Sequence, residues 1–461
     1  MALSFCPNCG ARRLPEAGYC GSCGHDFGTG SAAAPSPNNS PPAPVATQGA
    51  IRWQVLAAVA VAVVLVATGG VYALGRLQGS HAALPHGPST PVGAAPSATT
   101  ATGSFAQTGS LVIARFNNSA TPLLDGRVLV AGGEGGVGRV WSDVATAELY
   151  DAATGTFSRT GTMVNGRVWH FATRLLNGGV LIGGGDGVFN NGYTPLASVE
   201  LYDPATGAFS PTGSMTTDRE FPTATLLSDG RVLVAGGDNP YSACSILAST
   251  EVYDPTTGTF NSGATMEIGR EGQTATLLKN GLVLIAGGSG GCSAQSSAIM
   301  RSAELYDPRV NSFQPTGSLV TARSGQTATL LRDGRVLITG GCAESTGQGC
   351  TAVASAELYD PTSGTFSPTG SMSEPRVGHA ATLLPDGRVL IAGGCTREDN
   401  GCTPLTSAEI YDPRTGTFSP TGPMLPGRAG FTLTALETGG VLVTGNDSPE
   451  AGPIATAEVY R

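Results

Sequence analysis

The stretch "RVGHAATLLPDGRVLIAGGC", Arg376–Cys395, decides how the rest of the chain is interpreted. It holds an arginine, a histidine, an aspartate and a cysteine, which are residue types that active sites use. However, the same pattern returns along the chain every 51 to 53 residues, and a fixed period of this length indicates structural repeats. The turn dipeptide of the pattern marks seven copies, at Asp125-Gly126, Asn177-Gly178, Asp229-Gly230, Asn280-Gly281, Asp333-Gly334, Asp386-Gly387 and Thr438-Gly439.

Each copy predicts four short β-strands, which we label A to D. In the sixth copy these are the runs "GHAATLL", "RVLIAGG", "SAEIYDP" and "TFSPTG". Asp-Gly between strands A and B predicts a hairpin with a type I′ turn, because glycine readily adopts positive φ. Proline and glycine in "YDPRTG" predict a second tight turn, between strands C and D. One copy is therefore one antiparallel sheet, which cannot bury both of its faces alone and is expected to stack radially into a propeller.

Three repeated features resemble Kelch repeats, the family that includes the propeller of galactose oxidase. They are a Gly-Gly doublet ending strand B, Tyr-Asp-Pro after strand C and an aromatic residue opening strand D. The resemblance covers residues 104–461 and implies an all-β, seven-bladed Kelch-like β-propeller. Phenylalanine replaces the usual tryptophan of the family in a packing role, at Phe105, Phe157, Phe209, Phe260, Phe313, Phe366 and Phe418.

The order of the repeats predicts how the ring closes. The first strand-D segment, "FAQTG" at 105–109, precedes every other element, and the last strand C, "TAEVY" at 456–460, ends the chain. We expect the two segments to pair and to complete the seventh blade, which removes the open sheet edges.

The B–C connections differ between copies in length and content, and they share one face of the ring with the D–A connections. Variable loops on a rigid scaffold usually carry binding, so we expect a ligand on this face. The aromatic candidates for ligand contact are Trp141, Tyr193 and Tyr241.

An arginine precedes strand A in every copy, and a glutamate recurs in strand C. The arginines could form a cationic ring that binds an anion through forked hydrogen bonds. Alternatively, each could pair with the glutamate of its own blade as part of the architecture, and this interpretation is favoured because the two residues repeat together. The arginines are Arg115, Arg167, Arg219, Arg270, Arg323, Arg376 and Arg428.

Six cysteines lie in the B–C connections. The short spacings of Cys342 to Cys350 and of Cys395 to Cys402 predict two disulfides, and Cys244 with Cys292 could form a third. Disulfides are typical of compartments outside the reducing cytoplasm.

Residues 1–30 predict a zinc ribbon. Cys6, Cys9, Cys20 and Cys23 form two CxxC pairs, whose four thiolates can surround one structural Zn²⁺. A segment of this size cannot bury enough core to fold alone, so the metal would supply the folding free energy. The segment resembles the zinc ribbons found at the N-termini of many bacterial proteins.

A membrane anchor is predicted over residues 52–75. Residues 53–74 carry no charge and would span about 33 Å as a helix, enough to cross the bilayer core. We predict that residues 31–51 form a disordered linker. Residues 76–103, which are rich in Pro, Ala, Ser and Thr, are predicted to form a second linker. Thiolate zinc ligands and arginines before the span predict a cytoplasmic N-terminus and an extracytoplasmic propeller at the cell membrane.

The functional expectation is a membrane-anchored binding protein with an unknown protein or carbohydrate ligand outside the cell. A cytoplasmic protein partner for the zinc ribbon is a further expectation. A formal charge of −9 argues against a nucleic-acid partner. The alternatives are a carbohydrate-active enzyme of the cell surface and a transmembrane sensor or scaffold. A copper site like that of galactose oxidase needs two histidines and two tyrosines, whereas residues 104–461 contain only His170 and His379. No catalytic residues can be assigned.

Overall fold

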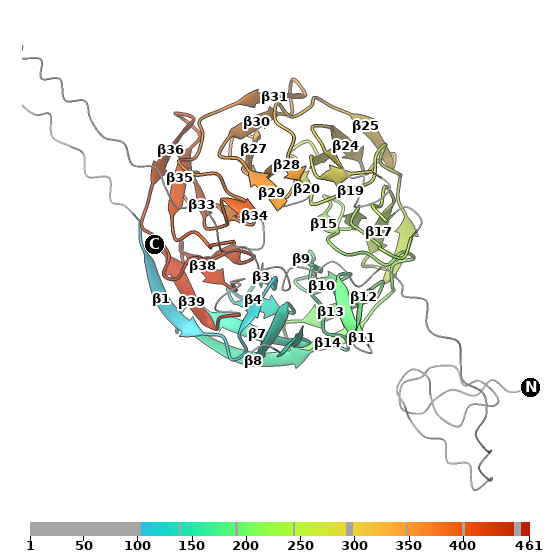
Figure 1. The fold of residues 1–461 in the computed structure, drawn as a ribbon. Coiled ribbons are helices and arrows are strands. Elements are labelled where there is room, and N and C mark those ends of the chain that lie inside the picture. The colour runs from blue at the N-terminus through green and yellow to red at the C-terminus, as the bar shows by residue number, and fades with distance from the viewer. Residues whose placement is uncertain are drawn as a thin grey trace, which may run out of the picture. The chain divides into compact units, whose positions relative to one another are not determined.

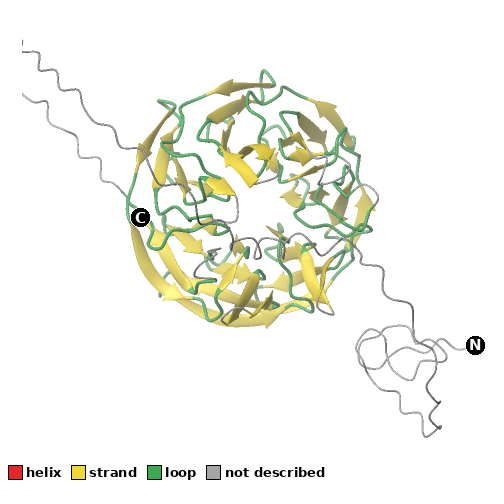
Figure 2. Cartoon of the chain, viewed as in Figure 1, coloured by secondary structure: helices red, strands yellow, loops and turns green. Residues whose placement is uncertain are grey.

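The computed structural model describes residues 103–461 apart from 138–139, 190–191, 243–244, 292–297, 347–348, 399–401 and 447–452. These residues form seven four-stranded antiparallel sheets that close into a ring, with no helix among them (Figure 1; Figure 2). The described residues accordingly include no helix that could cross a membrane. The predicted zinc ribbon, the anchor at 52–75 and the linker at 31–51 lie outside the described residues.

Strand A of each blade lies at the centre of the ring, because it contacts strand A of both neighbouring blades all the way round. We number the blades 1 to 7 in the order of their A strands, which are β3 (Ser119–Pro122), β9 (Phe171–Arg174), β15 (Thr223–Leu226), β20 (Thr274–Leu277), β26 (Thr327–Leu330), β32 (Ala380–Leu383) and β37 (Thr432–Ala435).

Strand B follows through a tight turn and is the most buried strand of each blade. The B strands are β4 (Val128–Ala131), β10 (Val180–Gly183), β16 (Val232–Ala235), β21 (Val283–Ala286), β27 (Val336–Thr339), β33 (Val389–Ala392) and β38 (Val441–Thr444).

Strands C and D complete each sheet toward the outside. The C strands are β7 (Thr146–Asp151), β13 (Val199–Asp203), β17 (Thr250–Asp254), β24 (Ala303–Asp307), β30 (Ala356–Asp360), β35 (Ala408–Asp412) and β39 (Thr456–Tyr460). The D strands are β8 (Thr156–Thr162), β14 (Ala208–Pro211), β18 (Thr259–Ser262), β25 (Ser312–Pro315), β31 (Thr365–Pro368), β36 (Thr417–Pro420) and, for blade 7, β1 (Phe105–Ser110).

The predicted closure is confirmed. Strand β1 pairs antiparallel with β39, with Phe105 opposite Tyr460, and blade 7 has the strand order β1-β39-β38-β37. The first and last described strands therefore share one sheet, and the ring has no open end.

The cores lie between blades. Because side chains alternate along a strand, Leu129 and Ala131 of β4 pack against blade 2, while Val128 and Val130 pack against blade 7. All four residues are buried, which explains why strand B reads as a continuous apolar run.

The predicted hairpins between strands A and B form, but the predicted type I′ turn is wrong. In blade 1, Leu123 pairs with Arg127 around a three-residue loop, and Gly126, but not Asp125, has positive φ. This is the three-residue hairpin in which a left-handed glycine follows the turn. Asp125 instead accepts a hydrogen bond from the Arg127 N–H at 3.1 Å.

Several of the B–C and D–A connections contain short strands, which pair into small additional sheets. The extra strands are β2 (Arg115–Phe116), β5 (Glu134–Val137), β6 (Val140–Asp143), β11 (Asp186–Phe189), β12 (Gly192–Pro195), β19 (Arg270–Glu271), β22 (Ser289–Gly290), β23 (Ala298–Ile299), β28 (Cys342–Thr346), β29 (Gly349–Ala352) and β34 (Arg397–Glu398).

Candidate binding site on the B–C face

The seven repeated arginines are buried in ion pairs. Each guanidinium lies 2.7 to 3.3 Å from the glutamate of strand C in its own blade, and every arginine has a relative exposure of 0 %. The pairs are Arg115–Glu148, Arg167–Glu200, Arg219–Glu251, Arg270–Glu304, Arg323–Glu357, Arg376–Glu409 and Arg428–Glu458.

The Nη groups of these arginines donate mainly within the blade, whereas Nε of Arg167, Arg219, Arg270 and Arg376 has no hydrogen-bond partner among the described residues. In blade 1, Arg115 Nη1 donates to the carbonyls of Gly132 at 3.0 Å and Thr146 at 2.9 Å. Glu148 accepts from the N–H groups of Val112 at 2.6 Å and Ile113 at 3.1 Å. Burial lowers the pKa of Arg115, and Glu148 opposes that shift. The pair ties the D–A connection to strands B and C. All seven guanidinium groups are buried and ion-paired, which favours the architectural interpretation over an anion-binding arginine ring.

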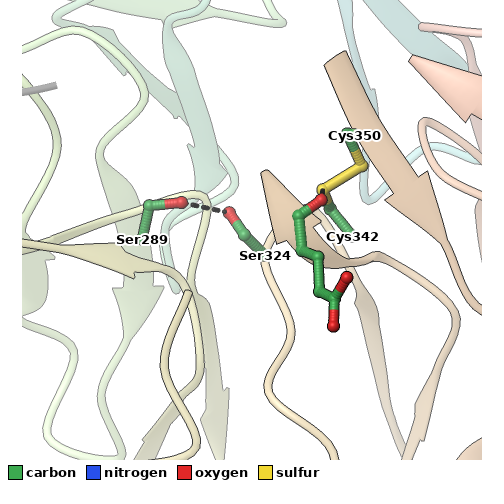
Figure 3. Close-up of a disulfide and its surroundings, with 5 residues drawn as sticks. Ser289, Ser324, Cys342 and Cys350 are labelled. Atoms are coloured by element: carbon green, nitrogen blue, oxygen red, sulfur yellow. Dashed lines mark hydrogen bonds between the residues drawn. A yellow bond between two sulfur atoms is a disulfide. The ribbon is translucent and has the colours of Figure 1, made fainter. Parts of the chain in front are cut away.

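Two disulfides close B–C connections, Cys342–Cys350 (Figure 3) and Cys395–Cys402. Cys350 lies opposite Glu398 of β34, so these connections of blades 5 and 6 share a small sheet. The hypothetical partners Cys244 and Cys292 lie outside the described residues, as do the zinc ligands Cys6, Cys9, Cys20 and Cys23.

The aromatic candidates lie on the B–C connections. Tyr241 has 74 % of its surface exposed. Trp141 lies in β6 opposite Gly136, and Tyr193 lies in β12 opposite Val188. All three segments belong to the face on which we expected a ligand.

The two histidines of the propeller lie in blades 2 and 6. His170 Nε2 lies 3.0 Å from Ser119 Oγ, and His379 Nε2 lies 3.1 Å from Thr327 Oγ1. Burial lowers the pKa of each histidine to about 3, with a further contribution from the neighbouring arginine charge. The histidines join neighbouring blades separately and do not meet, so these residues do not fit a shared copper site. The described residues hold no group of three His, Cys, Asp or Glu side chains that could bind a metal ion.

Two positions of blades 1 to 6 meet at the inner edge of the B–C face; we call them, with the described equivalent in blade 7, the inner rim. One position follows the arginine, and the other follows the Gly-Gly doublet. Within blades 1 to 6 the two positions pair through the backbone. Their side chains also come together across the interface of blades 4 and 5 and across the interfaces of blades 5 to 7. The rim residues after the arginine are Phe116, Val168, Glu220, Glu271, Ser324, Val377 and Ala429; those described after the doublet are Glu134, Asp186, Asp238, Ser289, Cys342 and Cys395.

Three acidic residues gather on the rim of blades 2 and 3. Asp186, Glu220 and Asp238 are 2 %, 9 % and 4 % exposed, and the carboxyl groups of Asp186 and Glu220 hydrogen-bond to each other. Burial and the neighbouring acidic groups raise the pKa of Glu220 to about 9. The pKa of Asp186 rises to about 6, mainly through burial. Both shifts favour the protonated form, so this pair takes up a proton more readily than two exposed carboxyl groups would.

A stacked aromatic pair follows the same rim residues. The ring centroids of Trp169 and Phe221 are 4.8 Å apart with an interplanar angle of 29°, and the Phe221 N–H donates to the Trp169 carbonyl at 3.1 Å. Both residues have positive φ, 55° and 51°. Blades 4 to 7 have glycine at this position, as Gly272, Gly325, Gly378 and Gly430, with φ between 57° and 65°.

Bulky residues in this left-handed conformation cost about 1–3 kcal/mol each. Such strain is retained where surrounding interactions enforce it, and it clusters at binding sites. The sequence carries a signal for this site: Trp169 and Phe221 stand at a position that is Asn117 in blade 1 and glycine in blades 4 to 7. In addition, Asp186 and Asp238 differ from the serine and cysteines found at the same position in later blades.

A separate apolar hollow of about 400 Å³ lies at the A–B turns of blades 1 and 2, on the other face of the ring. Its lining includes Leu124 and Leu176, which are 62 % and 67 % exposed. It offers no charged group beyond Arg174, whose Nη1 donates to the Pro122 carbonyl at 3.0 Å.

Comparison with known proteins agrees with this architecture. The Kelch motif matches residues 222–267 and 375–425. Beta-scruin of Limulus polyphemus is 26 % identical over 283 residues, which cover 58 % of this chain but only 29 % of the length of beta-scruin. A fungal alcohol oxidase of the AA5 family, solved in complex with copper, has a TM-score of 0.61 at 18 % identity, covering 78 % of this chain and 76 % of the oxidase chain. The motif matches, the ring of seven sheets and this structural neighbour together support a Kelch-type β-propeller.

Proposed function

We propose that this chain is an interaction protein whose propeller binds a partner protein through the face formed by the B–C and D–A connections. One observation carries the proposal: the arginine–glutamate pair that repeats in every blade is buried within the blade, whereas the inner rim of the same face differs from blade to blade. A repeated frame with unequal residues on one face is what a binding scaffold requires. The Kelch motifs support an interaction role as well.

We further propose that residues 52–75 anchor the chain in the cell membrane with the propeller outside the cytoplasm. The uncharged run at 53–74 supports the anchor, and the two disulfides of the propeller support an oxidising compartment. The zinc ribbon of Cys6, Cys9, Cys20 and Cys23 would then lie in the cytoplasm, where it stabilises the N-terminal segment or binds a second partner.

Site-specific crosslinking on intact cells tests which face binds. A photoreactive phenylalanine analogue at Tyr241 reports on the B–C face, and the same analogue at Leu124 reports on the A–B turns; both side chains are exposed. We expect a discrete crosslinked product from position 241 and none from position 124. Products from position 124 alone would contradict the proposed face.

Protease treatment of the same cells tests the orientation. External protease should cleave the propeller and leave an epitope tag before Cys6 protected. Protection of the propeller would contradict the proposed localisation.

A further inference from the structure

We propose that Asp186, Glu220 and Asp238, together with the rings of Trp169 and Phe221, form a receptor for one guanidinium side chain, an arginine presented by the partner protein. The inference rests on the proposed function, because it names the group that the B–C face recognises. We call these five residues the acidic-aromatic site.

Backbone pairing brings the five residues together at the junction of blades 2 and 3. Val168, which precedes Trp169, pairs with Asp186, and Glu220, which precedes Phe221, pairs with Asp238. The Phe221 N–H···O=C Trp169 hydrogen bond joins the two blades directly. Each ring is thus one residue away from a backbone partner of one of the buried acids.

The acidic groups have hydrogen-bonding capacity that the chain does not use. Asp186 and Asp238 are almost completely buried, yet Oδ1 of each finds no hydrogen-bond partner in the described part of the chain. The charges that act on Glu220 are those of Asp186, Asp238 and Glu271, all of the same sign. A buried group of like charges with unsatisfied acceptors is matched by a cation that donates several hydrogen bonds.

The architecture of the ring does not require these acids. At the equivalent junction of blades 4 and 5, Ser289 stands in place of Asp186 and Ser324 in place of Glu220, and their hydroxyl groups hydrogen-bond at 3.1 Å (Figure 3). A neutral pair therefore suffices to join two blades at this position. The glycines of blades 4 to 7 show in the same way that the backbone does not need Trp169 or Phe221.

The rings select guanidinium among cations. Phe221 is 40 % exposed, so part of the aromatic pair is open to solvent. A guanidinium group is planar, stacks on aromatic faces and donates in a fork that matches a carboxylate, whereas an ammonium group offers a point charge. A sugar would also stack on the rings, but its neutral hydroxyl groups would not compensate the accumulated negative charge.

The direct test is a titration of the full-length protein in nanodiscs with three short peptides that contain a single arginine, lysine or citrulline between glycines. Citrulline keeps the shape of arginine without its charge. Binding is followed by calorimetry in buffers of different ionisation enthalpy. At pH 8 we expect the arginine peptide to bind at least tenfold more tightly than the citrulline peptide, with release of protons, because the bound cation favours ionised carboxyl groups.

The variants use substitutions that the ring already contains. In the double variant Asp186→Ser/Glu220→Ser the junction copies Ser289 and Ser324, and Phe221→Gly copies Gly325. Both should lose binding of the arginine peptide by about tenfold or more, while Leu124→Ala, at the exposed A–B turn on the other face of the ring, should retain it. A thermal melt checks folding, and Asp238→Asn provides an isosteric second variant of the same site.

Equal binding of the arginine and citrulline peptides, or full binding by the double variant, would overturn the proposal. A glycan array signal that depends on Trp169 while the arginine peptide fails to bind would overturn it in favour of a carbohydrate ligand. Crosslinking at position 241 distinguishes a failure of the guanidinium receptor from a failure of the proposed binding face. If the crosslinked product persists while the arginine peptide does not bind, the binding face is supported and the guanidinium receptor is contradicted.

Discussion

The inner rim is acidic at the junction of blades 2 and 3, next to the stacked aromatic pair, whereas at the junctions of blades 5 to 7 it is apolar and its B–C connections are closed by disulfides. At the junctions of blades 5 to 7, one hydrophobic cluster includes Cys342, Val377, Cys395 and Ala429. Both cysteines form disulfides within their own B–C connections. At the junction of blades 2 and 3, the equivalent rim positions hold the buried carboxyl groups of Asp186, Glu220 and Asp238. The backbone is equivalent on the two sides, so the difference lies in the side chains that the frame carries.

The features that repeat in every blade, which we call the frame, do not differ between the two sides. Each blade has the same arginine–glutamate pair, the same Tyr–Phe contact between strands C and D and the same apolar strand B, for example Tyr202–Phe209 in blade 2 and Tyr359–Phe366 in blade 5. Residues that repeat in all blades therefore maintain the ring, and residues that separate one side from the other are available for recognition.

The largest effect is expected from opening the ring, which should damage both sides at once. Deletion of residues 104–110 removes β1, the outer strand of blade 7, and exposes the edge of β39. We expect a drop in Tm of about 10 °C or more, since a loss of several kcal/mol shifts Tm by about 2–4 °C for each kcal/mol in domains of 150–250 residues. Deletion of seven residues from the 76–103 linker is the control, and an unchanged melt after the first deletion would contradict closure by β1.

Breaking one frame pair should cost less than opening the ring but should be independent of the side chosen. Arg323→Met leaves Glu357 buried without its cation, which should lower the free energy of unfolding by about 3–5 kcal/mol. The double variant Arg323→Met/Glu357→Leu should recover much of that loss, because no unpaired charge remains. Denaturant unfolding measures both. A loss below about 1 kcal/mol in the single variant would mean that the pair is not part of the frame.

The frame could be predicted from the sequence because its residues recur in every blade. The seven Asp-Gly or related turns and the order of Phe105 and Tyr460 were enough to predict the blade count and the closure, since each signal occurs in every copy. The turn type was missed because a dipeptide does not reveal whether the loop has two or three residues. The small sheets of the B–C connections were missed because their strands are short and lack a repeated pattern.

The acidic-aromatic site was missed for a different reason. Trp169 and Phe221 look like ordinary apolar residues until the backbone shows that they occupy left-handed positions. Asp186 and Glu220 are 34 residues apart in the chain and belong to different blades, so nothing in their spacing predicts that their carboxyl groups share a hydrogen bond. The arginines stood out in the sequence because they recur, and recurrence turned out to mark their structural role.

The acidic side should make stability depend on pH, and the apolar side should not. The folded pKa of Glu220, about 9, lies above its ordinary value of 4.5, so the folded state keeps a proton that the unfolded state releases between these values. The free energy of unfolding should therefore fall as pH rises from about 5 to about 9, by at least ~1 kcal/mol given that one pKa unit corresponds to ~1.4 kcal/mol. The variant Asp186→Ser/Glu220→Ser should flatten this slope, and an identical slope in the variant would show that the carboxyl pair does not cause it.

The smallest effect on stability is expected from the residues that differ most between the two sides. The variant Trp169→Gly relieves the strain of a left-handed tryptophan, which stabilises the fold. It also removes the ring contact with Phe221 and gives the unfolded chain more conformational freedom, which both destabilise the fold. Because these effects oppose each other, the free energy of unfolding should change by less than ~1 kcal/mol. Phe209→Ala, which removes a ring packed on Tyr202, should instead cost about 3–5 kcal/mol. If Trp169→Gly costs as much as Phe209→Ala, the stacked pair is part of the frame after all. If it does not, the left-handed aromatic residues are retained for something other than folding, and the contrast between the two sides of the rim is one of recognition.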